Sequence, residues 1–510
     1  MYFAEAHSGP VPWITIAALG LSNYLVSLDL TMLSTAMPCI APSLASIPLY
    51  MSASQLACAI VHLVASKLYL LFRVKWTFMS FLMVVCLGAL VGALSNSTTM
   101  LVLGRVVMGV GMAGVQCGCG VMVSRVVPGE RQGLVQRIMM GAVQAGLVSG
   151  CVFGGLFTQF VSWRWCFWID LPVALMVLVL VVVSGEIADG EGWFGFRELW
   201  ASVDVVGLVL FAGGVVMLLL GLYFGGVVYP WENARVIGCF CGAGVVLLVW
   251  GLWNWKKGDE GVVPGSVVRV RKVWTACLTG ALVFGSWVLG VWFLSVYFQG
   301  VQGMSPLESG VMLLPNILAQ VFFSWVAGWL IKHIGFGLVG CLGAVFIATG
   351  SGSISTYEPD TGAGWKIGMQ ILLGLGYGFA LQIPMIAIQA TVYPHDIPAA
   401  TSLLTSCQHL AAALFVSCGN TIMMNSLALL ILEEIPSVDP KETINAGVKE
   451  LRSVIPETAL EDVLEAFSES MYRVYWFSAA CGGLAVICSF GMEWFKLRMR
   501  NSAVAARNVS

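Results

Sequence analysis

Fourteen apolar runs, each about 18 to 25 residues long, constrain what this chain can fold into more than any other feature. A helix of that length crosses the roughly 30 Å of hydrocarbon in a bilayer. Sheets with open edges cannot span lipid, because their unpaired backbone groups find no water there. The pattern therefore predicts an all-α polytopic membrane protein with about fourteen transmembrane helices. The runs cover approximately residues 12–36, 54–72, 76–95, 99–124, 134–160, 164–184, 203–224, 235–254, 274–298, 308–331, 336–356, 365–390, 401–431 and 473–495.

The composition excludes a soluble protein. Apolar residues make up 58% of the chain, charged residues only 10%, and the mean hydropathy is +0.88. That leaves too little polar surface to cover a globule of 510 residues. A net charge of -2 gives no reason to expect a nucleic-acid partner, so the lipid bilayer is the expected surrounding. The 15 cysteines lack metal-ligand spacing, and we expect neither a metal site nor a disulfide.

Basic residues predict the orientation in the membrane, because cytoplasmic loops are enriched in lysine and arginine. With the first span entering from the inside, sixteen basic residues fall in the inner loops and the C-terminal tail, against three in the short outer loops. We therefore expect both termini to be cytoplasmic. The inner set is Arg73, Lys75, Arg125, Arg131, Arg137, Arg197, Lys256, Lys257, Arg269, Arg271, Lys272, Lys332, Lys496, Arg498, Arg500 and Arg507, and the outer set is Arg164, Arg235 and Lys366.

Two outer loops carry further features. Residues 432–472 form a long loop with ten acids, and its apolar residues recur at helical spacing, which predicts two short amphipathic helices over the outer mouth. A solvated cap is favoured over a selectivity lid for this loop. Asn96-Ser97-Thr98 is an N-glycosylation sequon in another outer loop. That loop is so short that we expect Asn96 to be unmodified.

A faint internal repeat divides the chain. Gly109-Val110-Gly111 recurs as Gly374-Leu375-Gly376, and the turn at residues 127–130 corresponds to the turn at residues 393–396. Two repeated bundles around a central site are a common plan of transporters. We expect an N-terminal six-helix bundle in residues 1–200, an inserted helix pair with a cytoplasmic linker in residues 201–272, and a C-terminal six-helix bundle in residues 273–510.

Five parts of the sequence together resemble one transporter family. They are residues 28–31 with 35–38, residues 103–105, residues 150–155 with 163–172, residues 297–299 with 305–310 and 314–315, and the second copy of the repeat. Over nearly its whole length the chain is similar to the major facilitator superfamily, in particular to its fungal fourteen-helix drug:proton antiporter branch of toxin and secondary-metabolite efflux pumps. The resemblance implies a major facilitator fold that uses a proton gradient and no bound cofactor. We further expect a monomer, in the plasma membrane rather than the vacuolar membrane.

The fifth span carries the glycine spacing of the antiporter motif in that family. The motif residues here are Gly146, Gly150, Cys151, Gly154 and Gly155. Glycines at this spacing let two helices touch backbone to backbone. Cys151 stands where the family usually has a proline, so this helix is expected to be straighter and its barrier against leak weaker. Cys151 therefore also weakens the support for export over uptake.

Two more positions depart from the family pattern. Leu70, in the loop after the second span, replaces the acid that would latch the two bundles together. This loss leaves a non-transporting membrane sensor open as an alternative. Asp170 replaces a more usual asparagine and adds a titratable group, which we expect near the outer surface.

Asp29 and Arg105 are the candidate proton-coupling residues. Asp29 lies mid-span in the first helix, where a lone carboxyl stays protonated unless water or a cation reaches it. The resemblance gives this position a role in proton handling, and the alternative is a neutral carboxyl in a helix-packing hydrogen bond. Arg105 in the fourth span needs a carboxylate or carbonyl partner inside the bundle, unless it lies at the interface and snorkels. The repeat copy has Gln370 there, so charge is concentrated in the N-terminal half.

A substrate cavity is expected between the ninth and twelfth spans. An amphipathic ligand requires a mostly apolar pocket with a few hydrogen-bonding groups. The candidates are Trp287, Trp292, Tyr297 and Gln299 in the ninth span, with Gln382, Met385 and Gln389 in the twelfth. Three further polar residues, Gln136, Gln144 and His409, are expected to make hydrogen bonds between helices.

The sequence gives no support to an enzyme. There is no glycine loop with a lysine for nucleotide binding, no pair of metal ligands and no nucleophile arrangement. The favoured interpretation is proton-coupled efflux of a small amphipathic compound, a secondary metabolite, toxin or drug, by alternating access. A proton-coupled uptake carrier on the same fold and a non-transporting sensor are the alternatives.

Overall fold

The computed structural model confirms the all-α membrane architecture. It describes residues 13–41, 43–185, 203–226, 228–357, 361–393, 396–436, 438–446, 448 and 451–492. This part of the chain contains fourteen helical segments long and apolar enough to cross a membrane. They are α1 (Trp13–Ile40), α2 (Ile47–Leu71), α3 (Val74–Ala93), α4 (Thr98–Val126), α5 (Gly129–Phe160), α6 (Trp165–Trp168) with α7 (Asp170–Val183), α9 (Val205–Phe224), α10 (Ala234–Lys257), α12 (Arg271–Gly300), α13 (Pro306–Ile334), α14 (Phe336–Ile354), α15 (Ala363–Ala380) with α16 (Ile383–Thr391), α17 (Ile397–Glu434) and α20 (Glu457–Ser489).

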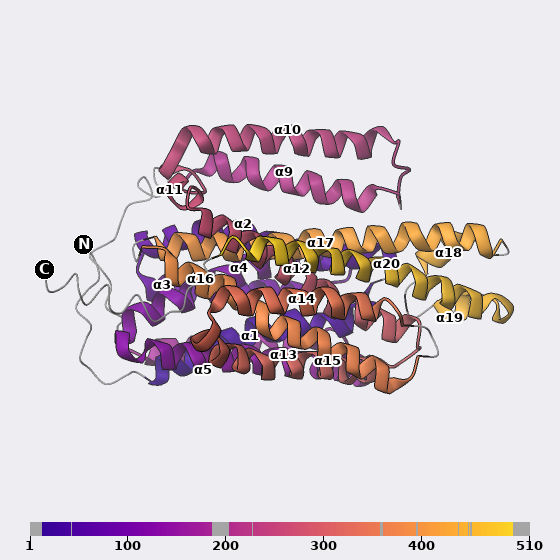
Figure 1. Ribbon diagram of the computed structural model, residues 1–510, viewed down its shortest axis with the longest axis horizontal. Helices are drawn as coiled ribbons and strands as arrows, with labels where there is room; N and C mark the ends of the chain where they lie inside the picture. Colours follow the sequence, from indigo (N-terminus) through magenta and orange to yellow (C-terminus); the bar gives the residue numbers. More distant parts are fainter. Residues whose placement is uncertain are drawn as a thin grey trace, which may run out of the picture.

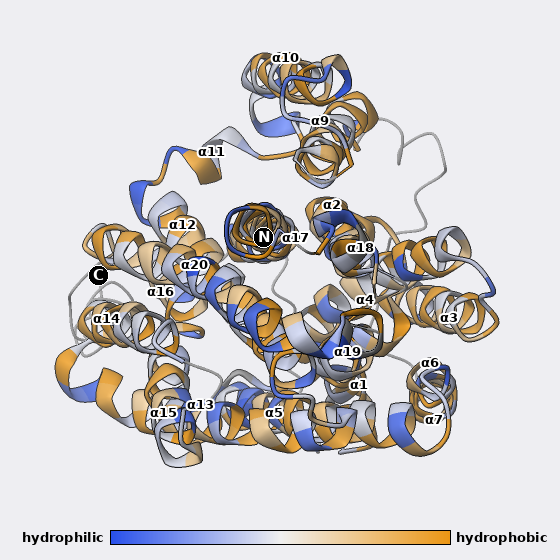
Figure 2. Ribbon diagram, turned by 90° about the vertical axis from the view of Figure 1, so that its right-hand side faces the viewer, coloured by the Kyte–Doolittle hydropathy of each residue, from blue (hydrophilic) through white to orange (hydrophobic). Residues whose placement is uncertain are grey.

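A helix pair lies apart from the rest of the molecule (Figure 1), which forms two helix bundles side by side (Figure 2). The first bundle contains α1 to α7, and the second contains α12 to α17 with α20. The pair α9 and α10 packs mainly on itself, while α9 also touches α2 and α17. In the end-on view of Figure 2 this pair lies beside the line where α2 meets α17, not between the bundles. The predicted domain boundary near residue 200 lies outside the described residues.

The two bundles repeat the same close helix contacts. α4 packs on α2 and α3, and α15 packs on α13 and α14. A Cβ on Gly111 would lie 2.6 Å from the backbone nitrogen of Val85 in α3, and one on Gly376 would lie 2.6 Å from that of Ile347 in α14. No side chain fits between backbones this close. The glycine repeat in the sequence therefore marks equivalent helix crossings in the two bundles.

The long outer loop is shorter than the sequence indicated. Its helices α18 (Pro440–Asn445) and α19 (Leu451–Val454) are short, and α20 already begins at Glu457 instead of near residue 473. Val463 and Phe467, expected in a separate amphipathic helix, are fully buried on α20. The Phe467 ring packs against Gly300 at the end of α12. Packing on the second bundle thus extends the last helix through much of the predicted loop.

The twelfth expected span consists of two helices that meet at Leu381 and Gln382. α15 ends at Ala380 and α16 begins at Ile383. Pro384 lies in the first turn of α16. Because proline lacks a backbone N–H and its ring clashes with the preceding turn, it ends one helix and is tolerated at the start of the next.

Candidate functional site

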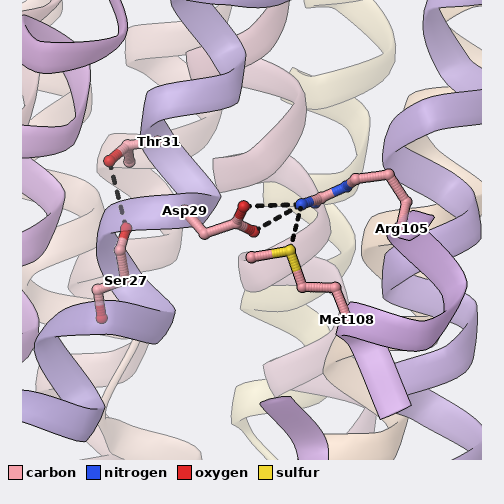
Figure 3. Close-up of polar contacts among 5 residues, drawn as sticks. All are labelled: Ser27, Asp29, Thr31, Arg105 and Met108. Carbon is pink, nitrogen blue, oxygen red and sulfur yellow. Dashed lines mark hydrogen bonds and ion pairs between the residues drawn. The ribbon is translucent and has the colours of Figure 1, made fainter. Parts of the chain in front are cut away.

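A buried ion pair joins α1 to α4 in the first bundle. One guanidinium nitrogen of Arg105, Nη1, donates to Asp29 Oδ1 at 2.7 Å and to Oδ2 at 2.9 Å, and it contacts Met108 Sδ at 3.6 Å (Figure 3). Arg105 is 1% exposed and Asp29 is 2% exposed. A side chain that snorkels to the interface would reach solvent, and this one does not. Within the described residues, Nε of Arg105 has no hydrogen-bond partner.

Close packing fixes the Arg105 turn of α4. A Cβ on Gly104 would lie 2.8 Å from the backbone nitrogen of Gly92 in α3. On the next turn, Gly109 touches the carbonyl of Ser54 in α2. These glycine contacts hold α4 against two neighbours at backbone distance. The guanidinium is therefore presented from a rigid helix to the carboxylate on α1.

The α1 turn that carries Asp29 rests on the backbone of α5. Three glycines on α5 each face an α1 carbonyl so closely that no Cβ fits. A Cβ on either of the first two would lie 2.6 Å from the carbonyl oxygen that it faces. The glycines are Gly146, Gly150 and Gly154, and the α1 carbonyls are those of Tyr24, Leu28 and Met32. Asp29 lies within this stretch of α1. The Asp29 turn is therefore held against α5 on one side and paired with Arg105 of α4 on the other.

The two bundles meet at the end that the basic residues predict to be extracellular. The Gln299 side chain on α12 donates from Nε2 to the Thr35 carbonyl of α1 at 2.9 Å. The backbone N–H of Leu307, at the start of α13, donates to Gln159 Oε1 of α5 at 3.2 Å. Both contacts cross from one bundle to the other. We name these four residues the outer seal.

Two glycines bring the backbones of α5 and α13 together next to the outer seal. A Cβ on Gly155 would lie 2.5 Å from the Pro306 carbonyl oxygen, and Gly310 packs directly on the Cys151 carbonyl. Thr35 Oγ1 also donates to that carbonyl at 3.3 Å. α5 is one continuous helix that includes Cys151. The predicted antiporter motif thus serves two contacts, one to α1 and one to the second bundle.

Asp170 is fully enclosed by protein. We expected it near the outer surface of the membrane; it lies early in the Trp165–Val183 span and is 0% exposed. It is the first residue of α7, which packs on α1 and α3. Neither carboxyl oxygen has a hydrogen-bond partner among the described residues. The packing of α7 on α1 and α3 therefore encloses this carboxyl group.

The predicted cavity residues of α12 are largely occupied in packing. Trp287 is 3% exposed, and its indole Nε1 donates to Gln320 Oε1 at 2.6 Å. Trp292 lines a cavity of only about 10 Å³. The rings of Tyr297 and Tyr357 lie 6.0 Å apart, at the outer end of the second bundle. Gln299, the remaining member, belongs to the outer seal.

The predicted residues of the twelfth span lie toward the end that the basic residues predict to be cytoplasmic. Gln382 and Met385 are half-buried and Gln389 is exposed. Met385 packs against a hydrophobic cluster that contains Ile388 and Leu404. This cluster is separate from the one that contains Trp287 and Trp292. The structure therefore does not bring the seven predicted residues together around one cavity.

A shallow, open apolar groove of about 420 Å³ lies elsewhere, between α1 and α5 at the end that the basic residues predict to be cytoplasmic. Its lining is almost entirely apolar. Its lining residues are Trp13, Ile16, Ala17, Gly20, Leu21, Tyr24, Ile138 and Ala142. The groove borders the same α1–α5 contact that carries Asp29 further along the helix.

Sequence reasoning missed a polar cluster that spans both bundles. The imidazole rings of His62 in α2 and His409 in α17 stack with their centroids 5.1 Å apart. His409 also contacts Gln55 Oε1 at 2.5 Å and Gln116 Oε1 at 3.3 Å. The expected interhelical hydrogen bond of His409 is thus present, whereas Gln136 is exposed. The available signal was Gln55 and His62, seven residues apart and so on one face of an otherwise apolar helix.

Asn96 is exposed in the short turn between α3 and α4. Its side-chain oxygen accepts a hydrogen bond from Arg164 Nη2 at 2.9 Å, and the neighbouring Ser97 caps α4. The amide is thus engaged with the turn before α6, and our prediction that Asn96 is unmodified stays a prediction.

Solved structures share this fold at low sequence identity. A bacterial homolog of the human lysosomal transporter Spinster, in an inward-facing and unoccupied conformation, matches with a TM-score of 0.63 and 14% identity over 95% of this chain and 98% of its own. A D-xylose-proton symporter matches with a TM-score of 0.61 and 12% identity over 96% of this chain and 99% of its own. At these identities the likeness concerns the fold alone.

Curated fungal proteins are similar along nearly the whole chain. The MFS-type transporter pigP of Monascus ruber is 36% identical over 97% of this chain and 90% of its own length. The efflux pump mlcE of Penicillium citrinum is 33% identical over 96% and 92%, and the efflux pump bfoC of Aspergillus brasiliensis is 33% identical over 92% and 85%. The family model of the Major Facilitator Superfamily matches residues 19–191 and 203–416. The chain is a membrane transporter, and it belongs to the major facilitator superfamily.

Proposed function

We propose that this transporter exports a small amphipathic organic compound in exchange for protons, by alternating access between its two bundles. The observation that carries the proposal is the buried ion pair of Asp29 and Arg105. A paired carboxylate in a dry interior is stable only while its partner is near, and it takes up a proton when the pair separates. The pair therefore changes its proton affinity whenever α1 and α4 move apart.

The glycine contacts connect this proton site to the movement of the bundles. Gly146 and Gly150 place α5 on the Asp29 turn, and Gly155 places the same helix on α13 of the second bundle. A change at the outer seal is transmitted along one rigid helix to the ion pair. This mechanical connection supports coupling of proton binding to alternating access.

Export of a secondary metabolite, toxin or drug is the direction and substrate class that we favour. Several relatives are named efflux pumps, and the 420 Å³ groove at the predicted cytoplasmic end is lined by apolar side chains. We place the protein in the plasma membrane, as a monomer. The apolar groove faces the side from which an exported compound would load.

Proton-coupled uptake is the second candidate, and Cys151 is the observation that favours it. The unbroken α5 lacks the proline of the antiporter pattern at this contact with α13. An uptake carrier would move its substrate in the same direction as the proton, and an exporter would move it in the opposite direction.

Flux in reconstituted vesicles with pH gradients of both signs tests the proposal. The probes are fluorescent or radiolabelled compounds from several amphipathic classes. An exporter accumulates its compound on the acidic side, whereas a symporter accumulates it on the alkaline side. Movement that ignores the sign and size of the gradient would contradict proton coupling in either direction.

A further inference from the structure

Asp170 is a second carboxyl group beside the ion pair. It lies within electrostatic reach of both Asp29 and Arg105. The packing explains the proximity: Ile169, just before it, and Cys166 contact the cluster of Leu28 and Met32, which flank Asp29 on α1. Asp170 is fully enclosed, and both of its carboxyl oxygens lack a partner among the described residues.

Two ionised carboxylates beside a single guanidinium would leave one buried negative charge uncompensated. An ionised carboxyl without a partner is far more costly to bury than a protonated one. Arg105 here pairs with Asp29, so Asp170 holds a proton in this state. Nε of Arg105 is also unpartnered among the described residues.

We propose that Asp29 and Asp170 share one proton and compete for Arg105, so that Arg105 exchanges carboxyl partners during each transport cycle. In the state described here, Asp29 is ionised and Asp170 is protonated. In the other state, Arg105 pairs with an ionised Asp170 and Asp29 carries the proton. This inference deepens the proposed function and rests on it.

The exchange balances in atoms and charge. The O–H bond of Asp170 breaks, an O–H bond forms on Asp29, and the guanidinium of Arg105 moves from Asp29 to Asp170. The three groups carry no net charge before or after the step. Asp170 lies nearest the outer end of its helix and Asp29 lies mid-span, so the transfer carries the proton inward, as export by antiport requires.

Among the described residues, four ionisable groups lie around Asp170, and one of them can exchange a proton with it. They are Asp29 on α1, Arg105 on α4, Cys86 on α3 and Cys166 on α6. Buried cysteine thiols behave as small apolar groups. Asp29 is therefore the group with which Asp170 exchanges the proton.

Asp170→Asn tests the transport side of the inference. The variant keeps the shape and the Asp29–Arg105 pair but removes the second partner, so we expect at least a tenfold loss of gradient-driven export with substrate counterflow unchanged. Asp170→Glu should restore part of the gradient-driven export. The matched control is Asp204→Asn, which alters the cap of α9 away from this site. Gradient-driven export at the wild-type level in Asp170→Asn would overturn the inference.

A stability cycle tests the shared proton independently of transport. In Asp29→Asn, Asp170 ionises and pairs with Arg105, so we expect a small shift of the melting temperature. In the double variant Arg105 is buried without a carboxylate, and the shift should greatly exceed the sum of the two single shifts. Additive shifts would overturn the inference. If the wild type shows no gradient-driven export, the proposed function fails and this cycle alone decides whether the carboxyls compete.

Discussion

Gly155→Ala perturbs the contact that closes the outer end of the transporter. The new Cβ would lie 2.5 Å from the Pro306 carbonyl oxygen and 2.7 Å from Leu307 Cα, whereas ordinary contacts begin at 3.4 Å. The backbones must separate by about 0.9 Å, the difference between 2.5 Å and the ordinary contact distance of 3.4 Å. Overpacking of this kind costs about 1–3 kcal/mol. Because the cost falls on the closed state, the equilibrium shifts about 5- to 150-fold toward an open outer end.

Native Cys39 supplies the assay. It lies at the outer end of α1, and its thiol is 3.8 Å from Gln299 Oε1 of the outer seal. Opening of the seal exposes this thiol to a membrane-impermeant maleimide added from outside. The rate of labelling should rise in Gly155→Ala by a factor within the range above. The same measurement in a Cys39→Ser background identifies the signal.

Gly141→Ala is the matched control, because it lies on the same helix and a Cβ there meets no atom within 4 Å. Both variants gain the same intrinsic helix propensity, so only the contact with α13 differs. Equal labelling rates for Gly155→Ala and Gly141→Ala would refute the reasoning that this close contact holds the outer end shut.

Three further substitutions follow from the buried polar contacts. Arg105→Lys should abolish gradient-driven flux, because a buried lysine gives up its charge where a guanidinium does not; normal flux in vesicles would return Arg105 to a structural role. Trp287→Phe leaves a buried amide acceptor unpaired and should cost about 1–3 kcal/mol of stability, seen as a lower melting temperature; the exposed Trp325→Phe is its control, and equal melting temperatures would count against the bond. His409→Leu removes the partner of Gln55 in the other bundle, with a cost of about 1–3 kcal/mol, and an unchanged melting temperature would show that this cross-bundle contact contributes nothing.

Helices and the charged pair were predictable because hydrocarbon imposes strict rules. A run of apolar residues must be helical, and the charge of Arg105 must find a partner. The sequence could name Asp29 as the mid-span carboxyl, but not the 2.7 Å contact between them. That contact depends on glycines at 104 and 150, which set how closely four helices approach.

Contacts between distant segments were not predictable from local patterns. The outer seal and the His62–His409 stack each join residues more than 100 positions apart. The burial of Asp170 was not predictable because it depends on the packing of α7 against α1. The start of α20 was misplaced because its acidic surface resembles a solvated cap while its apolar face packs on α12.

Proton-driven and counterflow transport by Asp29→Asn, compared in the same vesicles, tests the central claim most directly. Counterflow needs only substrate binding and alternating access, whereas net transport against a gradient also needs a proton site. We predict that Asp29→Asn retains counterflow and loses accumulation driven by the pH gradient. Wild-type accumulation in Asp29→Asn would contradict the claim that the buried pair of Asp29 and Arg105 couples protons to transport.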